Sequence, residues 1–422
     1  MKYVILVGDG MADRPVEALQ GRTPLAAAFT PNMDSLVSTG GWCGAAYTLP
    51  ENLPAGSDVA NLSILGYDPE RYYTGRAPLE AASMGIELKD TDVAFRCNLV
   101  TLGRREDGKR YMEDYSAGQI SQDEGRQLIR HLNDHLRDKM RGVLCDGADF
   151  RFYPGVSYRN LLLWNALTPD MTASGCTPPH DITGKGIDEW LPRGEGAGAL
   201  ILNVMIESSW EMLEDHPINR KRVAEGKKPA NSIWLWGQGK KPALPRFSGA
   251  YGIPGAMISA VDLTRGLAGL AGLDVINVPG ATGYIDTNYA GKAQYALKSL
   301  EEGADLVYVH VEAPDEASHE GSLEHKIKAI EDFDALIVGA IMKGMREKGK
   351  EKNFERFRVL LMPDHATPLA LRTHSREPVP FVIWDSGQDT PAMAGGYNES
   401  ILGLEGIVHL PAHKIMGRLL EI

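Results

Sequence analysis

The chain has 422 residues, of which 43% are hydrophobic and 24% charged, and its formal net charge is -12. At roughly 100 to 200 residues per domain, this length allows two or three domains, each with its own core. An acidic chain without a long basic run lacks the charge distribution of a nucleic-acid-binding protein, so we expect no nucleic-acid partner.

The cysteines and the N-terminal segment narrow the expected location of the protein. Cys43, Cys97, Cys145 and Cys176 are far apart and form no CxxC pair, which argues against a disulfide framework or a zinc ribbon. The apolar start of the chain is interrupted at residues 8–10, too early for a signal peptide. No run approaches the roughly 18 apolar residues of a membrane span. We therefore expect a cytoplasmic protein with no membrane contact, acting as a monomer or a small homo-oligomer.

Short apolar runs recur along the chain and are typical of buried strands. Helical patterns lie between several of them, at 292–303 and 325–349 among others. Strands that alternate with helices predict an α/β fold built on a doubly wound, mostly parallel sheet, which binds ligands beyond the carboxyl ends of its strands. The predicted strands are residues 3–7, 233–236, 256–260, 274–278, 305–311, 358–362 and 380–384.

The middle of the chain has a different pattern. A strand at 95–102 and a polar hairpin at 103–110 precede a helix at 122–140, and two further strands follow at 149–156 and 159–164. This order predicts an α+β module inserted into the α/β domain, with hinges near Gly85 and Gly184. We therefore expect a metal-binding catalytic domain over 1–87 and 188–422, and an inserted substrate-binding or lid domain over 88–187.

Acidic and imidazole side chains follow three of the predicted strands. Asp9 follows the first strand, Asp315 and His319 follow the strand at 305–311, and Asp364 and His365 follow the strand at 358–362. In a parallel sheet these strand ends meet at one edge, and a helical spacing of four places Asp315 and His319 on one face. With His374 shortly downstream, the pattern predicts a split metal site.

Asp and His without Cys form the ligand set of Mn²⁺, Zn²⁺, Co²⁺ or Mg²⁺. Six such ligands exceed the need of one tetrahedral ion and suit two, and two ions roughly 3.5 to 4 Å apart clamp the oxygens of a phosphoryl group. A single Asp or His at a strand end is usually a cap or a structural residue. Their coincidence at three strand ends favours the metal site.

Ser57 is the candidate nucleophile. It follows Pro-Ala-Gly and opens an apolar helical pattern, so its hydroxyl is expected at a helix N-terminus. The common role of such a serine is an N-cap. The same position suits a phosphorylated serine, because free N–H groups and the helix dipole favour an anion there.

Five motifs together resemble one known family. They are GDGMAD around Asp9, PAGSDVANLSILGYDP around Ser57, EAPDEASHEG around Asp315, PDHATP around Asp364 and RTHSREPVPF around His374. With them the chain closely resembles the cofactor-independent phosphoglycerate mutases of the archaeal-type branch, within the alkaline phosphatase superfamily. The resemblance covers essentially the whole chain.

The resemblance implies a ligand set and a reaction. One metal ion would be held by Asp9, Ser57, Asp364 and His365, and a second by the remaining three candidate ligands, which are Asp315, His319 and His374. Ser57 would take the phosphoryl group of 3-phosphoglycerate, and the 2-hydroxyl of the re-oriented glycerate would take it back. Closure of the inserted domain would keep water from the phosphoserine.

Other residues are expected to contact the substrate or support the ligands. Arg96, Arg159 and Lys240 could meet a carboxylate or a phosphate, and His180 with Asp181 could act as general acid and base. The alternative is that each has no role in the site and is only a surface charge or a turn residue. A further pair, Glu312 and Glu316, is expected to hydrogen-bond the metal ligands or to lie in a solvated acidic loop.

Three alternatives to a mutase remain open at this point. Segments 230–247 and 310–321 resemble a bacterial subgroup for which homoserine kinase activity has been proposed, with phosphate passed from ATP through the same site. A phosphomonoester hydrolase on the same core would have an open site rather than a lid. A binding protein without catalysis is the third alternative, and the complete set of candidate ligands argues against it.

Overall fold

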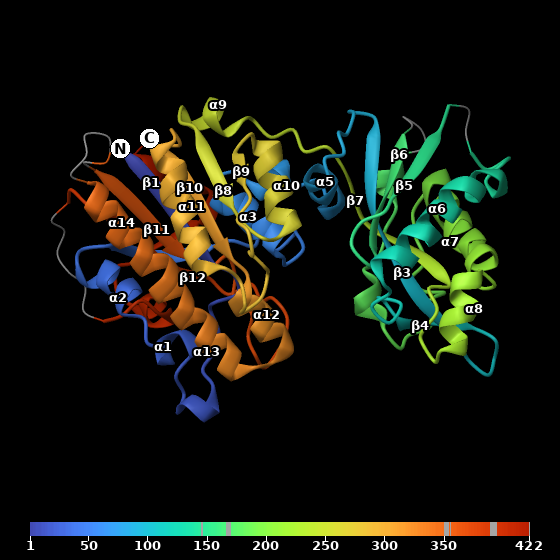
Figure 1. Ribbon diagram of the computed structural model, residues 1–422, viewed down its shortest axis with the longest axis horizontal. Helices are drawn as coiled ribbons and strands as arrows, with labels where there is room; N and C mark the ends of the chain where they lie inside the picture. Colours follow the sequence, from blue (N-terminus) through green and yellow to red (C-terminus); the bar gives the residue numbers. More distant parts are fainter. Residues whose placement is uncertain (145–146, 166–169, 350–353, 355, 389–394, 422) are drawn as a thin grey trace. The chain divides into compact units, whose positions relative to one another are not determined.

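The computed structural model describes residues 1–144, 147–165, 170–349, 354, 356–388 and 395–421 (Figure 1). The chain forms two compact units. The first unit combines Met1–Tyr73 with Ala243–Ile422, and the second unit is Thr74–Pro242. Among the described residues, no helix has both the length and the apolar character needed to cross a membrane.

The first unit is built on an eight-stranded sheet with the order β13-β2-β12-β11-β1-β10-β8-β9. Its centre is parallel, because β1 pairs in parallel with β10 and β11, and β10 does so with β8. The predicted α/β fold is thus confirmed, except that β12 runs antiparallel to both of its neighbours. The strands are β1 (Lys2–Gly8), β2 (Trp42–Tyr47), β8 (Gly255–Ile258), β9 (Asp274–Ile276), β10 (Leu306–Val311), β11 (Phe357–Met362), β12 (Val379–Asp385) and β13 (Val408–Pro411).

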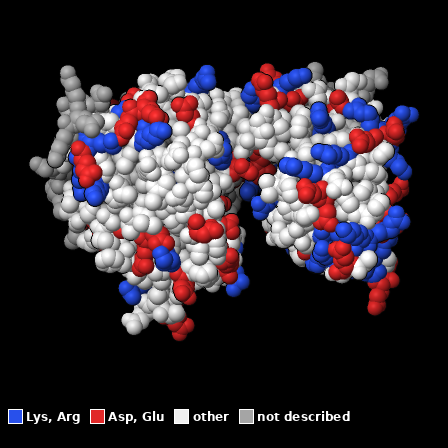
Figure 2. All heavy atoms as spheres, viewed as in Figure 1, with Lys and Arg blue, Asp and Glu red and all other residues white. Residues whose placement is uncertain are grey.

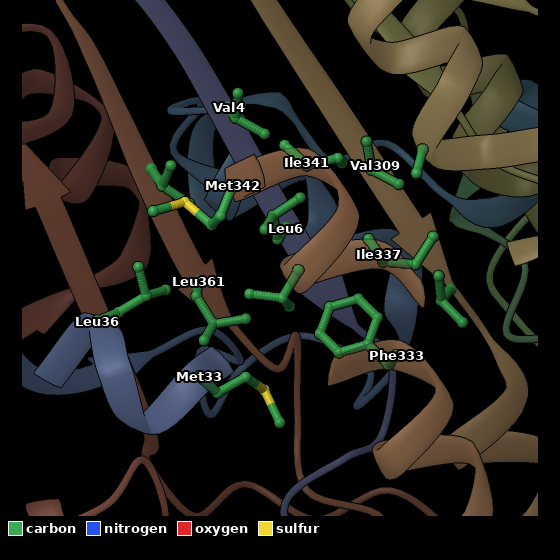
Figure 3. Packing of buried hydrophobic residues seen from close by; sticks show 14 of the residues in the cluster. Val4, Leu6, Met33, Leu36, Val309, Phe333, Ile337, Ile341, Met342 and Leu361 are labelled. Atoms are coloured by element: carbon green, nitrogen blue, oxygen red, sulfur yellow. The ribbon is translucent and has the colours of Figure 1, made fainter. Parts of the chain in front are cut away.

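Helices cover the sheet because the central strands are apolar on both faces, as buried parallel strands are. Alternate residues of β1, such as Val4 and Leu6, lie in the core cluster shown in Figure 3. Phe333 and Ile337, which belong to the π-helical segment η4, pack against them there. The helices of this unit are α1 (Pro24–Ala27), α2 (Pro31–Ser38), α3 (Ser57–Ile64), α4 (Pro69–Tyr72), α9 (Phe247–Tyr251), α10 (Asp262–Ala271), α11 (Tyr289–Glu301), α12 (Ala313–Glu320), α13 (Leu323–Asp332), the π-helical segment η4 (Phe333–Gly339), α14 (Ala340–Lys348) and α15 (Ile415–Leu420).

The second unit contains an antiparallel sheet in which β3 pairs with β4, β6 and β7. Amphipathic helices pack on it and bury side chains such as Leu128 and Leu202 in a separate core. In Figure 2 its basic and acidic side chains lie next to one another. Arg104 and Arg110, for example, form ion pairs with Glu214. Its elements are α5 (Arg76–Ser83), β3 (Asp92–Arg104), β4 (Arg110–Asp114), α6 (Gln122–Lys139), β5 (Asp149–Tyr153), β6 (Arg159–Asn165), α7 (Ala197–Leu213), α8 (Pro217–Ala224) and β7 (Ser232–Lys240).

The structure corrects the extent of the insertion. The second unit runs from Thr74 to Pro242, whereas the sequence pattern placed the insertion at 88–187 with hinges near Gly85 and Gly184. The predicted strand at 233–236 is part of β7, and it belongs to this unit because it pairs antiparallel with β3 and lies beside α7, not in the parallel sheet. An apolar run shows that a strand is buried but not which sheet it joins.

Candidate active site

The candidate ligands of the first unit lie at one edge of its sheet. Asp9 comes directly after β1, and β1 lies between β10 and β11 in the sheet. Asp364 and His365 follow β11, while α12 begins two residues after β10 and carries Asp315 and His319 one helical turn apart. The strand ends therefore converge as the sequence predicted, because neighbouring parallel strands end at the same edge.

Gly10 allows two of these strand ends to approach each other. Its φ is +59°, and a Cβ placed on it would lie 2.4 Å from Asp315 Oδ1 and 2.7 Å from Thr367 Oγ1. The Gly10 N–H donates to Asp364 Oδ1 at 3.1 Å. Any larger residue here would be strained and would push the carboxylate of Asp315 away.

Asp315, His319 and His374 form a triangle of ligand atoms. His319 Nε2 lies 3.1 Å from Asp315 Oδ2 and 3.2 Å from His374 Nε2, and the distance from His374 Nε2 to Asp315 Oδ2 is 3.6 Å. Nitrogen and oxygen ligands about 2.0 to 2.2 Å from a tetrahedral ion lie roughly 3.3 to 3.6 Å apart. The three side chains thus have a spacing that suits one metal ion.

A second group centres on His365. Its Nε2 lies 3.5 Å from Asp9 Oδ1, 3.5 Å from Asp364 Oδ2 and 3.1 Å from Ser57 Oγ. His365 also offers a nitrogen within 4.8 Å of ligand atoms of Asp315 and His374, so it lies between the two groups. The seven candidate ligands predicted from the sequence are brought together by the fold.

Ser57 is the first residue of α3, and the N-cap is Gly56, which has no side chain. The N-cap role considered for Ser57 is therefore not the one it has, and its Oγ faces the His365 ring instead. Asn61 fixes this end of α3, since its side chain donates to Ser57 O at 2.8 Å and to Asp364 Oδ2 at 2.9 Å. The serine hydroxyl is thus held beside the candidate ligands at a helix N-terminus.

Several titratable groups of the site are buried close together. Burial raises the pKa of Asp9 well above its usual value, and the charges of Asp364, Asp315 and Glu312 raise it further. Burial likewise raises the pKa of Asp364. For His365, burial and then the charge of His374 hold the pKa well below its usual value, which keeps the ring neutral. Buried carboxylates beside neutral imidazoles are the arrangement that a divalent cation stabilises.

Among the described residues, two buried polar atoms of the site have no hydrogen bond. They are Asp9 Oδ1 and His310 Nε2, both side chains are almost completely buried, and His310 Nε2 lies 3.1 Å from Asp9 Oδ2. His310 offers a ligand atom within 4.8 Å of Asp9 and Asp364, and it was not predicted as a site residue. The available signal was a histidine inside the otherwise apolar and fully buried strand β10. Unsatisfied buried acceptors of this kind fit a group that binds a metal ion.

Two side chains that hydrogen-bond the candidate ligands were not predicted from the sequence. Thr367 Oγ1 donates to Asp315 Oδ1 at 2.5 Å, and Asn61 donates to Asp364. Glu312 occupies the N-cap position of α12 and acts on Asp9 through its charge, and Glu316 lies in the first turn of the same helix. Neither Thr367 nor Asn61 has a distinctive sequence signal, because the partner of each lies far away in the chain. Thr367 bonds to a residue 52 positions away, and Asn61 bonds to one 303 positions away.

The second unit holds the predicted substrate-contacting residues. Arg96 is buried, pairs with Glu80 at 2.9 Å and lies over the Trp236 ring at 4.2 Å, and burial lowers its pKa to about 10. The His180 ring lies 5.3 Å from the same Trp236, and burial lowers its pKa. The charge of Arg76, which was not predicted, lowers the pKa of both residues further. Arg76 and Arg96, both paired with Glu80, thus form a cluster of charged side chains beside His180.

The remaining three predicted residues lie at different distances from this cluster. Arg159 starts β6, lies over Tyr158 at 5.1 Å and acts on Arg96 through its charge. Asp181 follows His180 in the chain, with 3.7 Å between the two side chains. Lys240 ends β7, four residues beyond Trp236, and so lies further along the strand.

Comparisons with known proteins agree with this geometry. Residues 39–219 match the family described as 2,3-bisphosphoglycerate-independent phosphoglycerate mutase. The chain is 53% identical to a probable 2,3-bisphosphoglycerate-independent phosphoglycerate mutase of Geobacter sulfurreducens and 51% identical to such a mutase of Methanosarcina acetivorans, with 100% of both chains covered in each case. The solved cofactor-independent phosphoglycerate mutase of Thermoplasma acidophilum is 28% identical with a TM-score of 0.64, over 100% of this chain and 99% of that chain.

Proposed function

The chain belongs to the 2,3-bisphosphoglycerate-independent phosphoglycerate mutases, which interconvert 3-phosphoglycerate and 2-phosphoglycerate, and we propose that Ser57 carries the phosphoryl group between the two positions. The observation that supports this most directly is the 3.1 Å contact between Ser57 Oγ and His365 Nε2 at the start of α3. Few roles other than nucleophilic attack require a serine hydroxyl at a helix N-terminus among so many carboxylates and imidazoles.

Two divalent metal ions would complete the site. Asp9, Ser57, Asp364 and His365 would hold one of them, with His310 close enough to join, and the Asp315, His319 and His374 triangle would hold the other. Oxygen and imidazole ligands suit Mn²⁺, Zn²⁺, Co²⁺ or Mg²⁺. When bound, such ions neutralise the charge on the transferring phosphoryl group and favour the deprotonated serine.

The residues of the chain divide the transfer into two steps. Ser57 Oγ forms a bond to phosphorus as the bond from phosphorus to the C3 oxygen breaks, which leaves phosphoserine and glycerate. The 2-hydroxyl oxygen of the re-oriented glycerate then bonds to phosphorus and Ser57 Oγ leaves. The N-terminal N–H groups of α3 stabilise the anion on Ser57 in between. His180, whose lowered pKa leaves it neutral at neutral pH, would with Asp181 move protons to and from the glycerate hydroxyls.

Arg96 and Arg159 would bind the carboxylate or phosphate of the substrate, and Lys240 would add charge at the end of β7. We expect Arg159→Ala to raise KM for 3-phosphoglycerate about 10- to 100-fold, because one charge-assisted hydrogen bond contributes about 1.5 to 3 kcal/mol. Steady-state kinetics of the variant measure this change.

Arg151 provides a matched control for this variant. It lies on the neighbouring strand β5, is exposed like Arg159 and covers a tyrosine ring at a similar distance, 5.3 Å from Tyr153. Arg151→Ala should leave KM unchanged. Equal changes in the two variants would show that Arg159 only adds surface charge.

Phosphorus NMR of the metal-loaded protein tests the proposed reaction. Incubation with 3-phosphoglycerate should yield 2-phosphoglycerate without free phosphate. Steady release of phosphate would instead show a hydrolase. A second sample with ATP and homoserine tests the kinase alternative, which the named relatives do not support. Phosphohomoserine in that sample, with the first sample unchanged, would overturn the proposal.

We also place the enzyme in the cytoplasm. Cys43, Cys97 and Cys176 are free thiols in the part of the chain that the structure describes, which agrees with a reducing compartment. Cys145 lies outside the described residues. The substrate is a small phosphorylated molecule, as it is for the phosphoglycerate mutase family.

A further inference from the structure

Lys326 on α13 is completely buried, which is unusual for a lysine. Its Nζ donates to Asp13 Oδ2 at 2.8 Å, to Thr367 O at 2.9 Å and to Ala12 O at 3.3 Å. All three N–H bonds of the ammonium group are therefore satisfied. The acceptors belong to two different loops, one after β1 and the other after β11, so a single charged group ties both loops to α13.

These two loops carry candidate ligands. Ala12 and Asp13 follow Asp9, and Thr367 follows His365 by two residues. The loops are also joined directly, because the Thr367 N–H donates to Ala12 O at 3.1 Å. Movement of either loop would displace a ligand of the site, and Lys326 is bonded where the loops meet.

The Thr367 side chain extends this connection to the ligand atoms. Its Oγ1 donates its single proton to Asp315 Oδ1 at 2.5 Å and lies 3.1 Å from His365 Nδ1. Since that proton is already used, His365 Nδ1 must donate to Thr367 Oγ1. The neutral His365 ring then carries its proton on Nδ1, which leaves the lone pair of Nε2 facing Ser57. The hydroxyl of Thr367 thus selects the tautomer that a metal ligand or a proton acceptor requires.

The carboxylate that pairs with Lys326 is itself held in place. Asp13 Oδ2 also accepts the Leu369 N–H at 3.1 Å, and the Asp13 N–H donates to Glu399 Oε1 at 2.9 Å. Burial lowers the pKa of Lys326, and the charge and hydrogen bond of Asp13 oppose that shift. A buried ion pair adds little stability compared with apolar residues of the same volume. The contacts instead indicate that this one fixes the geometry of the loops.

We propose that Lys326 is a positioning residue for the catalytic site: by holding the backbone of Thr367 and Ala12, it fixes the Thr367 hydroxyl that orients Asp315 and selects the His365 tautomer. The inference rests on the proposed metal-binding function of these ligands. It assigns to Lys326 no contact with substrate or metal. Its loss should therefore weaken metal binding and lower kcat, while KM changes little.

Lys326→Met, compared with Lys2→Met, tests this role. Lys2 is a matched control, because its Nζ also binds a backbone carbonyl, Ala304 O at 2.7 Å, and a carboxylate, Asp305 Oδ1 at 3.0 Å. It lies at the start of β1, at the opposite edge of the sheet from the site. Competition with a chromophoric chelator should show metal affinity lowered about 10- to 100-fold in Lys326→Met and unchanged in Lys2→Met. Equal metal affinities in the two variants would overturn the proposal.

Substitutions of Thr367 provide a second test of the proposal, which applies even if the Lys326→Met protein does not fold. Thr367→Val keeps the shape and the backbone acceptor but removes the hydroxyl, so it should reproduce the loss of metal affinity and of kcat. Thr367→Ser keeps the hydroxyl and should therefore retain the metal affinity and the kcat of the wild-type enzyme. A Thr367→Val enzyme with wild-type affinity would overturn the proposed connection. Because metal affinity is read without substrate, a wild-type protein that binds metal but shows no mutase activity would refute only the proposed function.

Discussion

Replacing Ser57 with Ala is expected to abolish phosphoryl transfer, with kcat lowered on the order of 10⁴-fold or more, because no other nucleophile can then form the covalent intermediate. Metal content should stay near the wild-type value. Asp9, Asp364 and His365 remain around the first position, and the Asp315 triangle is not changed. Phosphorus NMR measures turnover, and elemental analysis measures bound metal. Mass spectrometry of the wild-type enzyme quenched during turnover should find phosphate on the peptide that contains Ser57.

Ser63→Ala is the control for this variant. Ser63 lies on the same helix, α3, and is buried, whereas Ser57 is partly buried, and its replacement changes the helix by the same single oxygen atom. It should retain activity. Substantial turnover by Ser57→Ala, or a phosphoryl group found on another residue, would remove Ser57 from the nucleophile role.

Replacing Asp315 with Ala is expected to lower the bound metal from two ions toward one per chain. Asp315 Oδ2 lies within 3.6 Å of both His319 Nε2 and His374 Nε2, so its loss removes the carboxylate of that ligand triangle. Although burial opposes it, hydrogen bonds from the two histidines hold the pKa of Asp315 well below its usual value, and the group is therefore charged at neutral pH. The loss of a charged ligand should lower kcat by at least about 100-fold.

A buried carboxylate far from the site separates metal loss from loss of stability. Asp385 ends β12 at the opposite edge of the sheet and accepts a 2.6 Å hydrogen bond from Arg358 Nε. Asp385→Ala should lower the melting temperature, since the buried Arg358 then loses one of its two carboxylate partners and keeps only Glu421. It should keep the full metal content. Unchanged stoichiometry in Asp315→Ala by elemental analysis would contradict the assignment of this ligand group.

Most strands of the parallel sheet and the ligands at their ends were predictable from local patterns. The apolar runs predicted β1, β8, β9, β10, β11 and β12, whereas β2 and β13 were not predicted. Asp9, Asp364 and His365 follow such runs, and Asp315 and His319 lie one helical turn apart on α12. The boundary of the second unit was not predictable in this way. β7 has the same apolar character as the parallel strands, and only its pairing with β3 placed it in the antiparallel sheet.

The sequence by itself determined the chemistry of the site: which strands carry Asp and His at their ends, which serine opens a helix, and therefore which ions and which reaction are favoured. The tertiary structure alone decided which groups support that chemistry. His310 lies inside an otherwise apolar strand. Thr367 bonds to Asp315, which is 52 residues away, and Lys326 bonds to Asp13, which is 313 residues away. Local periodicity records whether a side chain is buried, whereas a hydrogen bond between distant residues depends on how the strands and helices pack.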